Sequence, residues 1–201
     1  MNFKYTYKMF TGIVEDLGVI KKIEKEGSNL HFTLTCAFTN ELQIDQSLAH
    51  NGVCLTVVNL SDDEYTVTAI DETLQKTDLA EWEVGRKVNL ERCMPANGRF
   101  DGHIVQGHVD AIAICEEIEN KNGSWRFKFS YDTDDVTVEK GSITVNGTSL
   151  TVVNSQAKSF EVHIIPYTYE NTVFHQLKIG DKVNIEFDVI GKYVARMLEK
   201  K

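Results

Sequence analysis

The sequence predicts an all-β fold made of two tandem copies of one small domain, followed by a C-terminal helix. Three observations support this prediction: a repeat with an offset of 95 residues, a succession of short strand-like runs in each copy, and an apolar stripe of helical period at the end of the chain. At about 100–200 residues per domain, a chain of 201 residues is compatible with one domain or two. The repeat decides in favour of two.

The repeat consists of four blocks that align without gaps at the same offset. Residues 47–59 (SLAHNGVCLTVVN) match residues 142–154 (SITVNGTSLTVVN) at eight of 13 positions, and residues 84–91 match 179–186 at five of eight. Residues 11–20 and 69–77 align with 106–115 and 164–172. A period this long indicates a duplicated domain rather than a solenoid. We expect domains at 9–97 and 98–188, joined at MPANGR (94–99), where Pro, Asn and Gly mark a loop.

Each copy contains about six short runs rich in Val, Ile, Thr and aromatic residues, separated by Gly, Asn and Asp. The runs of the first copy are GVIKKIEK, HFTLTC, CLTVVNL, EYTVTAI and KVNLERC, and those of the second are AIAIC, WRFKFSY, SITVNG, SLTVVN, FEVHII and KVNIEFDVI. This pattern predicts a small closed barrel, which has no exposed edge strand. Asn51-Gly52 and Asn146-Gly147 predict equivalent hairpin turns. Short helical turns are expected in DETLQKTDLAEW (71–82) and YENTVFHQL (169–177).

The tail, residues 189–201, has a different pattern from the two copies. Ile190, Tyr193, Val194, Met197 and Leu198 follow the i, i+3, i+4, i+7, i+8 spacing of one helix face. A helix this short is marginal alone in water and therefore needs a packing partner. That partner is either its own barrel or the equivalent helix of other subunits, and the second interpretation is favoured.

Composition excludes several function classes. With 21 Lys+Arg against 30 Asp+Glu, the net charge is −9, which disfavours a non-specific nucleic-acid binder or a basic patch for anionic membranes. The sequence has neither an apolar run of about 18 residues nor the apolar core of a signal peptide, so we expect a soluble, cytoplasmic protein. Cys36, Cys54, Cys93 and Cys115 lie in or beside apolar runs without CxxC spacing, which favours buried, reduced thiols.

Candidate chemical residues come from positions where the two copies differ. These pairs are Ile13/His108, Asp45/Lys140, Cys54/Ser149, Asp71/Pro166 and Cys93/Asp188. His108 is a structural histidine, an acid–base or substrate-donor group, or a surface residue. His103 lies five residues earlier, and on an extended strand this odd spacing would place the two rings on opposite faces, so no metal site is expected. Cys54 is an apolar strand cysteine or a nucleophile, and Asp188 is a functional carboxylate or a solvated strand end.

Five segments closely resemble the riboflavin synthase α-chain family over residues 9–198. They are MFTGIVE (9–15), AHNGVCLTVV (49–58), GHIVQGHVD (102–110), VNGTSLTVV (145–153) and KVNIEFD (182–188). The resemblance makes residues 1–8 an extension, or Met9 the true start. It implies two six-stranded Greek-key barrels and a homotrimer assembled by the last helix. It also implies the reaction: two molecules of 6,7-dimethyl-8-ribityllumazine give riboflavin and 5-amino-6-ribitylamino-uracil, the last step of riboflavin biosynthesis, without cofactor or metal.

The resemblance also implies the site residues. A first pocket would be lined by Gly12, Ile13, Val14, Cys54, Leu55, Thr56, Thr68, Ala69, Ile70, Asp71, Glu72 and Thr73. A second would be lined by Gly107, His108, Val109, Lys140, Ser149, Leu150, Thr151, His163, Ile164, Ile165, Pro166, Tyr167 and Thr168. His108 with Ser149 is the first choice for proton transfer. Cys54, Thr151 and Asp188 would orient substrate or stabilise charge, and Ser47 resembles a further active-site position. Asp71 and Tyr167 depart from the family, which often has Lys and Glu there.

Two other function classes are weighed against the synthase. One is a lumazine- or flavin-binding protein of the same fold without catalysis, which would show altered residues at the catalytic positions. Here Cys54, His108, Ser149, Thr151 and Asp188 all match the enzyme pattern. The other is the flavin-binding barrel of an oxidoreductase, for whose nicotinamide domain the chain has no room.

Overall fold

The computed structural model describes residues 9–198 and contains two closed antiparallel barrels of six strands each. The first barrel has the strand order β1-β2-β5-β4-β3-β6. Its strands are β1 (Asp16–Glu26), β2 (Asn29–Thr35), β3 (Ser47–His50), β4 (Val53–Ser61), β5 (Glu64–Ala69) and β6 (Lys87–Arg92). The second barrel repeats this order, each strand number being six higher. Its strands are β7 (Ala111–Asn120), β8 (Trp125–Tyr131), β9 (Ser142–Val145), β10 (Thr148–Gln156), β11 (Ser159–Ile164) and β12 (Lys182–Phe187). The predicted all-β duplicated fold is confirmed.

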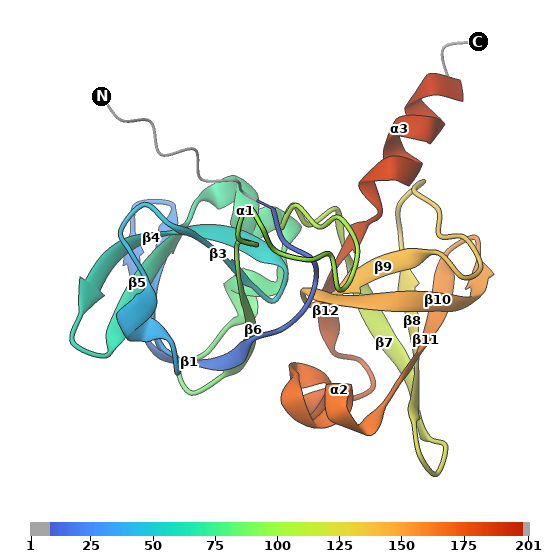
Figure 1. Cartoon of the computed structure of the whole chain (residues 1–201), viewed down its shortest axis with the longest axis horizontal. Coiled ribbons are helices and arrows are strands. Elements are labelled where there is room, and N and C mark those ends of the chain that lie inside the picture. The colour runs from blue at the N-terminus through green and yellow to red at the C-terminus, as the bar shows by residue number, and fades with distance from the viewer. Residues whose placement is uncertain (1–8, 199–201) are drawn as a thin grey trace.

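Each barrel encloses its own apolar core. The alternation of buried and exposed residues along β2, β5, β8 and β11 points one side chain in two toward the interior, as strand geometry requires. Phe32, Val67 and Leu90 are among the fully buried side chains of the first core, and Phe127, Val162 and Ile185 of the second. The two barrels lie side by side, the first drawn in blue to green and the second in yellow to orange (Figure 1).

The two predicted Asn-Gly hairpin turns are confirmed, and they meet at the contact between the barrels. Asn51 and Gly52 connect β3 to β4 with positive φ angles of 45° and 80°, and Asn146 and Gly147 connect β9 to β10 with 45° and 76°. A Cβ on Gly52 would lie 2.8 Å from the backbone nitrogen of Gly147, and a Cβ on Gly147 would lie 2.7 Å from that of Gly52. Glycine is therefore required twice at each turn, for the φ angle and for the close backbone contact.

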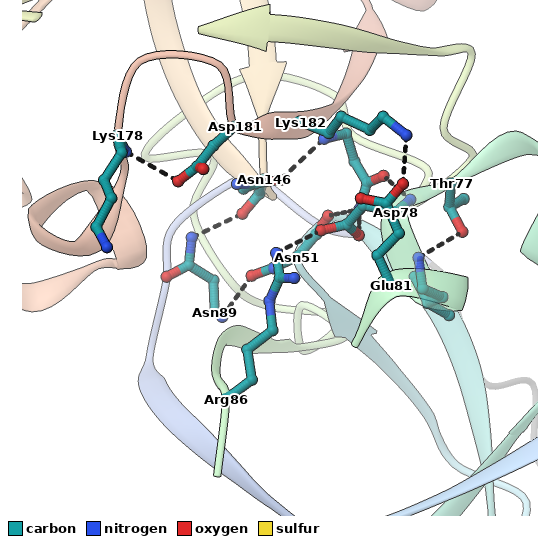
Figure 2. Close-up of polar contacts among 12 residues, drawn as sticks. Asn51, Thr77, Asp78, Glu81, Arg86, Asn89, Asn146, Lys178, Asp181 and Lys182 are labelled. Atoms are coloured by element: carbon teal, nitrogen blue, oxygen red, sulfur yellow. Dashed lines mark hydrogen bonds and ion pairs between the residues drawn. The ribbon is translucent and has the colours of Figure 1, made fainter. Parts of the chain in front are cut away.

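Buried asparagines join the barrels around these turns (Figure 2). Asn89 of β6 donates from Nδ2 to the Asn146 carbonyl at 2.7 Å, and Asn184 of β12 donates to the Asn51 carbonyl at 3.1 Å. The Asn89 side-chain oxygen accepts from the Val173 amide, and that of Asn184 from the Asp78 amide, both at 2.9 Å. Each of these hydrogen bonds has a counterpart made by residues 95 positions away in the sequence. The two barrels are therefore related by an approximate twofold axis.

Helical turns cover the entrance to the last strand in both copies, as predicted. They are α1 (Asp71–Lys76) with the 3₁₀ turn η2 (Asp78–Glu81), and α2 (Pro166–Asn171) with η3 (Val173–Gln176); a further 3₁₀ turn, η1 (Thr39–Glu41), lies in the first copy. The second pair begins earlier than expected, because Pro166 occupies the first turn of α2, where its missing N–H costs nothing.

The predicted C-terminal helix is confirmed as α3 (Val189–Leu198); residues 199–201 lie outside the described part. It projects from the second barrel (Figure 1), and none of its residues is buried. The side chains of its apolar stripe are 52–71% exposed. Packing on its own barrel therefore does not cover this face.

No disulfide joins the four cysteines, all of which lie within residues 9–198, and only Cys115 is fully buried. Burial raises the pKa of the Cys115 thiol to about 12. Within residues 9–198, no helix combines the length and apolar character needed to cross a bilayer.

Candidate functional site

The site is built where the two segments that precede β1 and β7 cross between the barrels. The Gly12 carbonyl accepts a hydrogen bond from the Ser149 amide of the second barrel at 2.7 Å. The Gly107 carbonyl accepts from the Cys54 amide of the first barrel at 2.9 Å. We call these two places the Ser149 site (Gly12 and Ser149) and the Cys54 site (Gly107 and Cys54).

Both crossings require glycine. Gly12 and Gly107 have φ angles of +77° and +75°. A Cβ on Gly12 would lie 2.6 Å from the Ser149 Cβ, and one on Gly107 would lie 2.7 Å from the Cys54 Cβ. The matching geometry shows that the two segments are copies of one structural element.

Between the two sites the crossing segments bind each other. Phe10 and Val105 form an antiparallel bridge, with N–H···O distances of 2.9 and 3.1 Å. They are buried with Ala49, and the half-buried Cys54 and Cys93 pack against them. This small core is separate from the two barrel interiors and fixes the spacing of the segments.

A buried glutamate holds each segment. Glu91, in β6, accepts hydrogen bonds from the Thr11 amide at 2.6 Å and from the Gly12 amide at 3.0 Å. Glu186, the equivalent residue of β12, accepts from the Gln106 amide at 2.7 Å and from the His108 amide at 2.9 Å. Burial raises the pKa of each carboxyl group to about 7, while the amide donors act in the opposite direction.

The grouping of pocket residues expected from the sequence is exchanged in the structure. Gly12, grouped with Cys54 above, contacts Ser149, and Gly107, grouped with Ser149, contacts Cys54. Val109 likewise packs against the core of the first barrel. The offset of 95 residues aligns each segment with its own copy, and only the three-dimensional structure shows that the segments reach the opposite barrel.

Ser149, which we expected to act with His108, has a different imidazole as its neighbour within the chain. The Ser149 hydroxyl lies 2.6 Å from Nδ1 of His103, whose Nε2 lies 3.3 Å from the buried Thr144 hydroxyl. Burial lowers the pKa of His103, and the nearby Asp188 carboxylate opposes that shift. An imidazole in its neutral form can accept a proton from a serine hydroxyl. The spacing of His103 from His108 was the one sequence feature that singled out His103, and that spacing carries no information about Ser149.

His108 itself is exposed at the Cys54 site. It lies in an irregular segment rather than on a strand, so the argument from alternating strand faces does not apply to it. Its counterpart Ile13 is 43% exposed beside the Ser149 site. The same backbone scaffold therefore presents an imidazole at one site and an apolar side chain at the other.

The other expected catalytic residues, Ser47, Thr151 and Asp188, differ in their exposure and in their hydrogen-bond partners. Ser47 is 1% exposed, and its hydroxyl has no partner in residues 9–198. Thr151 is exposed on β10, two residues after Ser149. Asp188 accepts the Ile190 amide at 3.0 Å and so caps α3, while its charge acts on His103.

The remaining expected pocket residues divide into exposed and core positions. Ala69, Ile164 and Leu55 are core residues of the barrels, so they can offer a ligand only backbone groups. The exposed or half-exposed members are Val14, Thr56, Thr68, Ile70, Asp71, Glu72, Thr73, Lys140, Leu150, His163, Ile165, Pro166, Tyr167 and Thr168. Lys140 lies in a tight turn with a φ of +64°, and the Thr68 hydroxyl lies 2.8 Å from Nδ1 of His31.

No group of three or more His, Cys, Asp or Glu in residues 9–198 is arranged to hold a metal ion.

Comparison with known proteins assigns the family. A family model described as the lumazine binding domain matches residues 11–93 and again residues 106–188. The riboflavin synthase of Bacillus amyloliquefaciens is 44% identical, with 96% of this chain and 91% of that protein covered. The riboflavin synthase of Saccharomyces cerevisiae is 36% identical, with coverages of 94% and 86%. The crystal structure of LumP complexed with 6,7-dimethyl-8-(1'-D-ribityl) lumazine matches with a TM-score of 0.82 at 25% identity, covering 89% of this chain and 99% of that one.

These matches extend over both barrels and confirm the resemblance seen in the sequence. The fold neighbour that binds a lumazine is less similar in sequence than the synthases are. The chain, with its two lumazine-binding domains, therefore belongs to the riboflavin synthase family.

Proposed function

We propose that this enzyme transfers a four-carbon unit between two molecules of 6,7-dimethyl-8-ribityllumazine, giving riboflavin and 5-amino-6-ribitylamino-uracil. It is a transferase of riboflavin biosynthesis. The observation that carries the proposal is the pair of crossed segments: two equivalent sites, each formed by residues of both halves of the chain. A reaction between two identical molecules requires two similar binding places, and the duplication supplies them.

The two molecules must nevertheless react differently, one as donor and one as acceptor. The Cys54 site has the exposed His108, whereas the Ser149 site has Ile13 at the same position and the His103–Ser149 contact. We propose that His108 transfers the proton that leaves the C7 methyl group of one lumazine, because imidazole is the side chain most often used as a general acid or base. Ser149 and Thr151 hydroxyls, which both donate and accept hydrogen bonds, suit the ribityl chain and the ring edge.

We propose further that the active enzyme is a homotrimer in the cytoplasm, in which the Cys54 site of one subunit faces the Ser149 site of its neighbour. The apolar stripe of α3 supports this assembly, because nothing in residues 9–198 covers its exposed side chains. An apolar cavity of about 610 Å³ lies between α3 and the loop at residues 134–142. Exposed apolar patches of this kind mark interaction surfaces.

Incubation of the purified protein with 6,7-dimethyl-8-ribityllumazine alone tests the reaction. Riboflavin is expected at half the molar amount of lumazine consumed, with no added cofactor. Tight binding of lumazine without product would instead indicate the non-catalytic binding protein.

Light scattering tests the assembly. We expect a mass three times the 22.8 kDa of the chain, and dissociation when Tyr193 and Met197 are replaced by Glu. An active monomer would contradict the intersubunit site.

A further inference from the structure

Glu91 and Glu186 are buried carboxylates with an unusual set of partners. They are 6% and 2% exposed, and neither takes part in any of the ion pairs within residues 9–198. Buried carboxylates are costly unless they are paired or fully hydrogen-bonded. Here the hydrogen-bond donors are backbone amides of the crossing segments.

The positions of these amides couple each glutamate to the opposite barrel. Glu91 belongs to the first barrel, but the Gly12 it binds delivers its carbonyl to Ser149 of the second. Glu186 belongs to the second barrel, but its segment delivers the Gly107 carbonyl to Cys54 of the first. In each case only the backbone around one glycine, Gly12 or Gly107, lies between the carboxylate and the residue of the opposite barrel.

Each glutamate binds its segment through both carboxylate oxygens. The two oxygens of Glu91 bind consecutive amides, together with the Thr11 hydroxyl at 3.1 Å. The two oxygens of Glu186 bind amides on either side of Gly107, each oxygen taking one. Bidentate binding of this kind fixes the direction as well as the position of the backbone.

We propose that Glu91 and Glu186 are crossed positioning residues: Glu91 of the first barrel orients the Ser149 site, and Glu186 of the second barrel orients the Cys54 site with His108. The kinetic part of this proposal rests on the proposed function, whereas its structural part does not. Because the two segments carry different side chains, the two glutamates have different effects on the reaction. Glu186 fixes the backbone of His108, and Glu91 fixes that of the neighbour of Ile13.

The structural part is tested by the amide NMR spectrum of the intact protein. Glu91→Gln replaces one acceptor oxygen by a donor, so the Thr11, Gly12 and Ser149 amide signals should shift while that of Cys54 does not. Glu186→Gln should shift Gln106, His108 and Cys54 and leave Ser149 unchanged. Glu117→Gln, at an exposed ion pair on the second barrel, is the control and should shift neither set. Shifts confined to the mutated barrel, or equal shifts at both sites in both variants, would overturn the proposal.

The kinetic part is tested by the split between kcat and KM. Glu186→Gln should lower kcat by about tenfold to a hundredfold, the effect of misplacing a reacting group by an ångström. Glu91→Gln should mainly raise KM, and Glu186→Asp, which keeps the charge, should recover part of the kcat. Equal losses of kcat in both Gln variants would contradict the assignment. If either Gln variant does not fold, scalar couplings across the wild-type hydrogen bonds from Thr11 and His108 to the two carboxylates decide the structural part.

Discussion

The two barrels have one backbone design but different interiors. At the offset of 95 residues, His50 and Tyr65 of the first barrel correspond to Val145 and Phe160 of the second. Nδ1 of the fully buried His50 donates to the Leu48 carbonyl, and its Nε2 accepts from the Tyr65 hydroxyl, both at 3.0 Å. The second barrel has apolar side chains in both places. In the first barrel the ring nitrogens of His50 and the Tyr65 hydroxyl all have partners, which offsets the cost of burying them.

The contact between the barrels is alike in the two copies, whereas the side chains next to it differ. Asn51, Asn89, Glu91 and the paired glycines are kept in both copies, and all of them lie where the two halves meet. Ile13 and His108, which differ between the copies, directly follow the glycines that make the crossing contacts. The shared contact residues therefore keep the two sites in equivalent positions, while the side chains at the two sites differ.

The largest effect is expected where the two sites differ. Replacing His108 by Ile, the residue of the other copy, should lower kcat by about 10²–10⁴, the usual contribution of a general acid–base. The change should have little effect on lumazine binding. Steady-state kinetics with a parallel fluorescence titration separate the two quantities. Wild-type kcat in His108→Ile would remove His108 from the mechanism.

The next largest effect, on the free energy of unfolding, is expected at the paired turn glycines, which are identical in the two halves. Gly52→Ala and Gly147→Ala should each lower the free energy of unfolding by about 3–4 kcal/mol, since positive φ strain and a backbone clash add together. Because the contact is symmetric, the two losses should agree. Gly27→Ala is the control, because Gly27 has a φ of +61° and open space around it, and it should lose about 1–2 kcal/mol. Urea unfolding at one protein concentration measures all three, and a loss confined to one of Gly52 and Gly147 would contradict the symmetry.

Sequence reasoning predicted the fold well because both barrels carry the same strand pattern, and a repeated error at the same offset is improbable. The crossing of the segments was not predictable, since Gly12 and Gly107 align with each other and the alignment contains no information about which barrel each one contacts. Glu91 and Glu186 are identical in the two copies, whereas candidate chemical residues were sought where the copies differ. His103 was overlooked as a partner of Ser149 because 46 residues separate them, and no local pattern links a loop histidine to a strand serine.

The buried His50 makes the acid stability of the two barrels different. Burial lowers the pKa of His50 from its ordinary value of 6.5 to about 4. The unfolded chain binds a proton there below pH 6.5 and the folded chain does not. The stability contributed by neutral His50 is therefore complete above pH 6.5 and lost as the pH falls to 4.

Transplanting the residues of the second barrel tests this difference. In the double variant His50→Val with Tyr65→Phe, the acid-dependent loss at this position, about 3 kcal/mol, should vanish. The measurement is the difference in free energy of unfolding between variant and wild type at pH 7 and at pH 4, in which the contributions of Glu91 and Glu186 cancel. A difference that stays constant with pH would show that His50 is protonated equally in the folded and unfolded chains.

The smallest effect concerns an aromatic pair that only the second barrel has. Trp125 stacks on Tyr169 of α2, with ring centroids 4.0 Å apart and an interplanar angle of 3°, where the first barrel has Leu30 and Leu74. Such a pair contributes about 0.5–1.5 kcal/mol beyond the burial of its area. A double-mutant cycle with Trp125→Leu and Tyr169→Leu should return a coupling energy of that size, and the same cycle to Ala at Leu30 and Leu74 should return less.

Since Trp125 pairs with Ile164 at the start of the expected pocket segment 163–168, loss of the stack should also weaken lumazine binding at the Ser149 site. Equal coupling in the two barrels would show that the stack adds only apolar contact, and that this difference between the barrels carries no function.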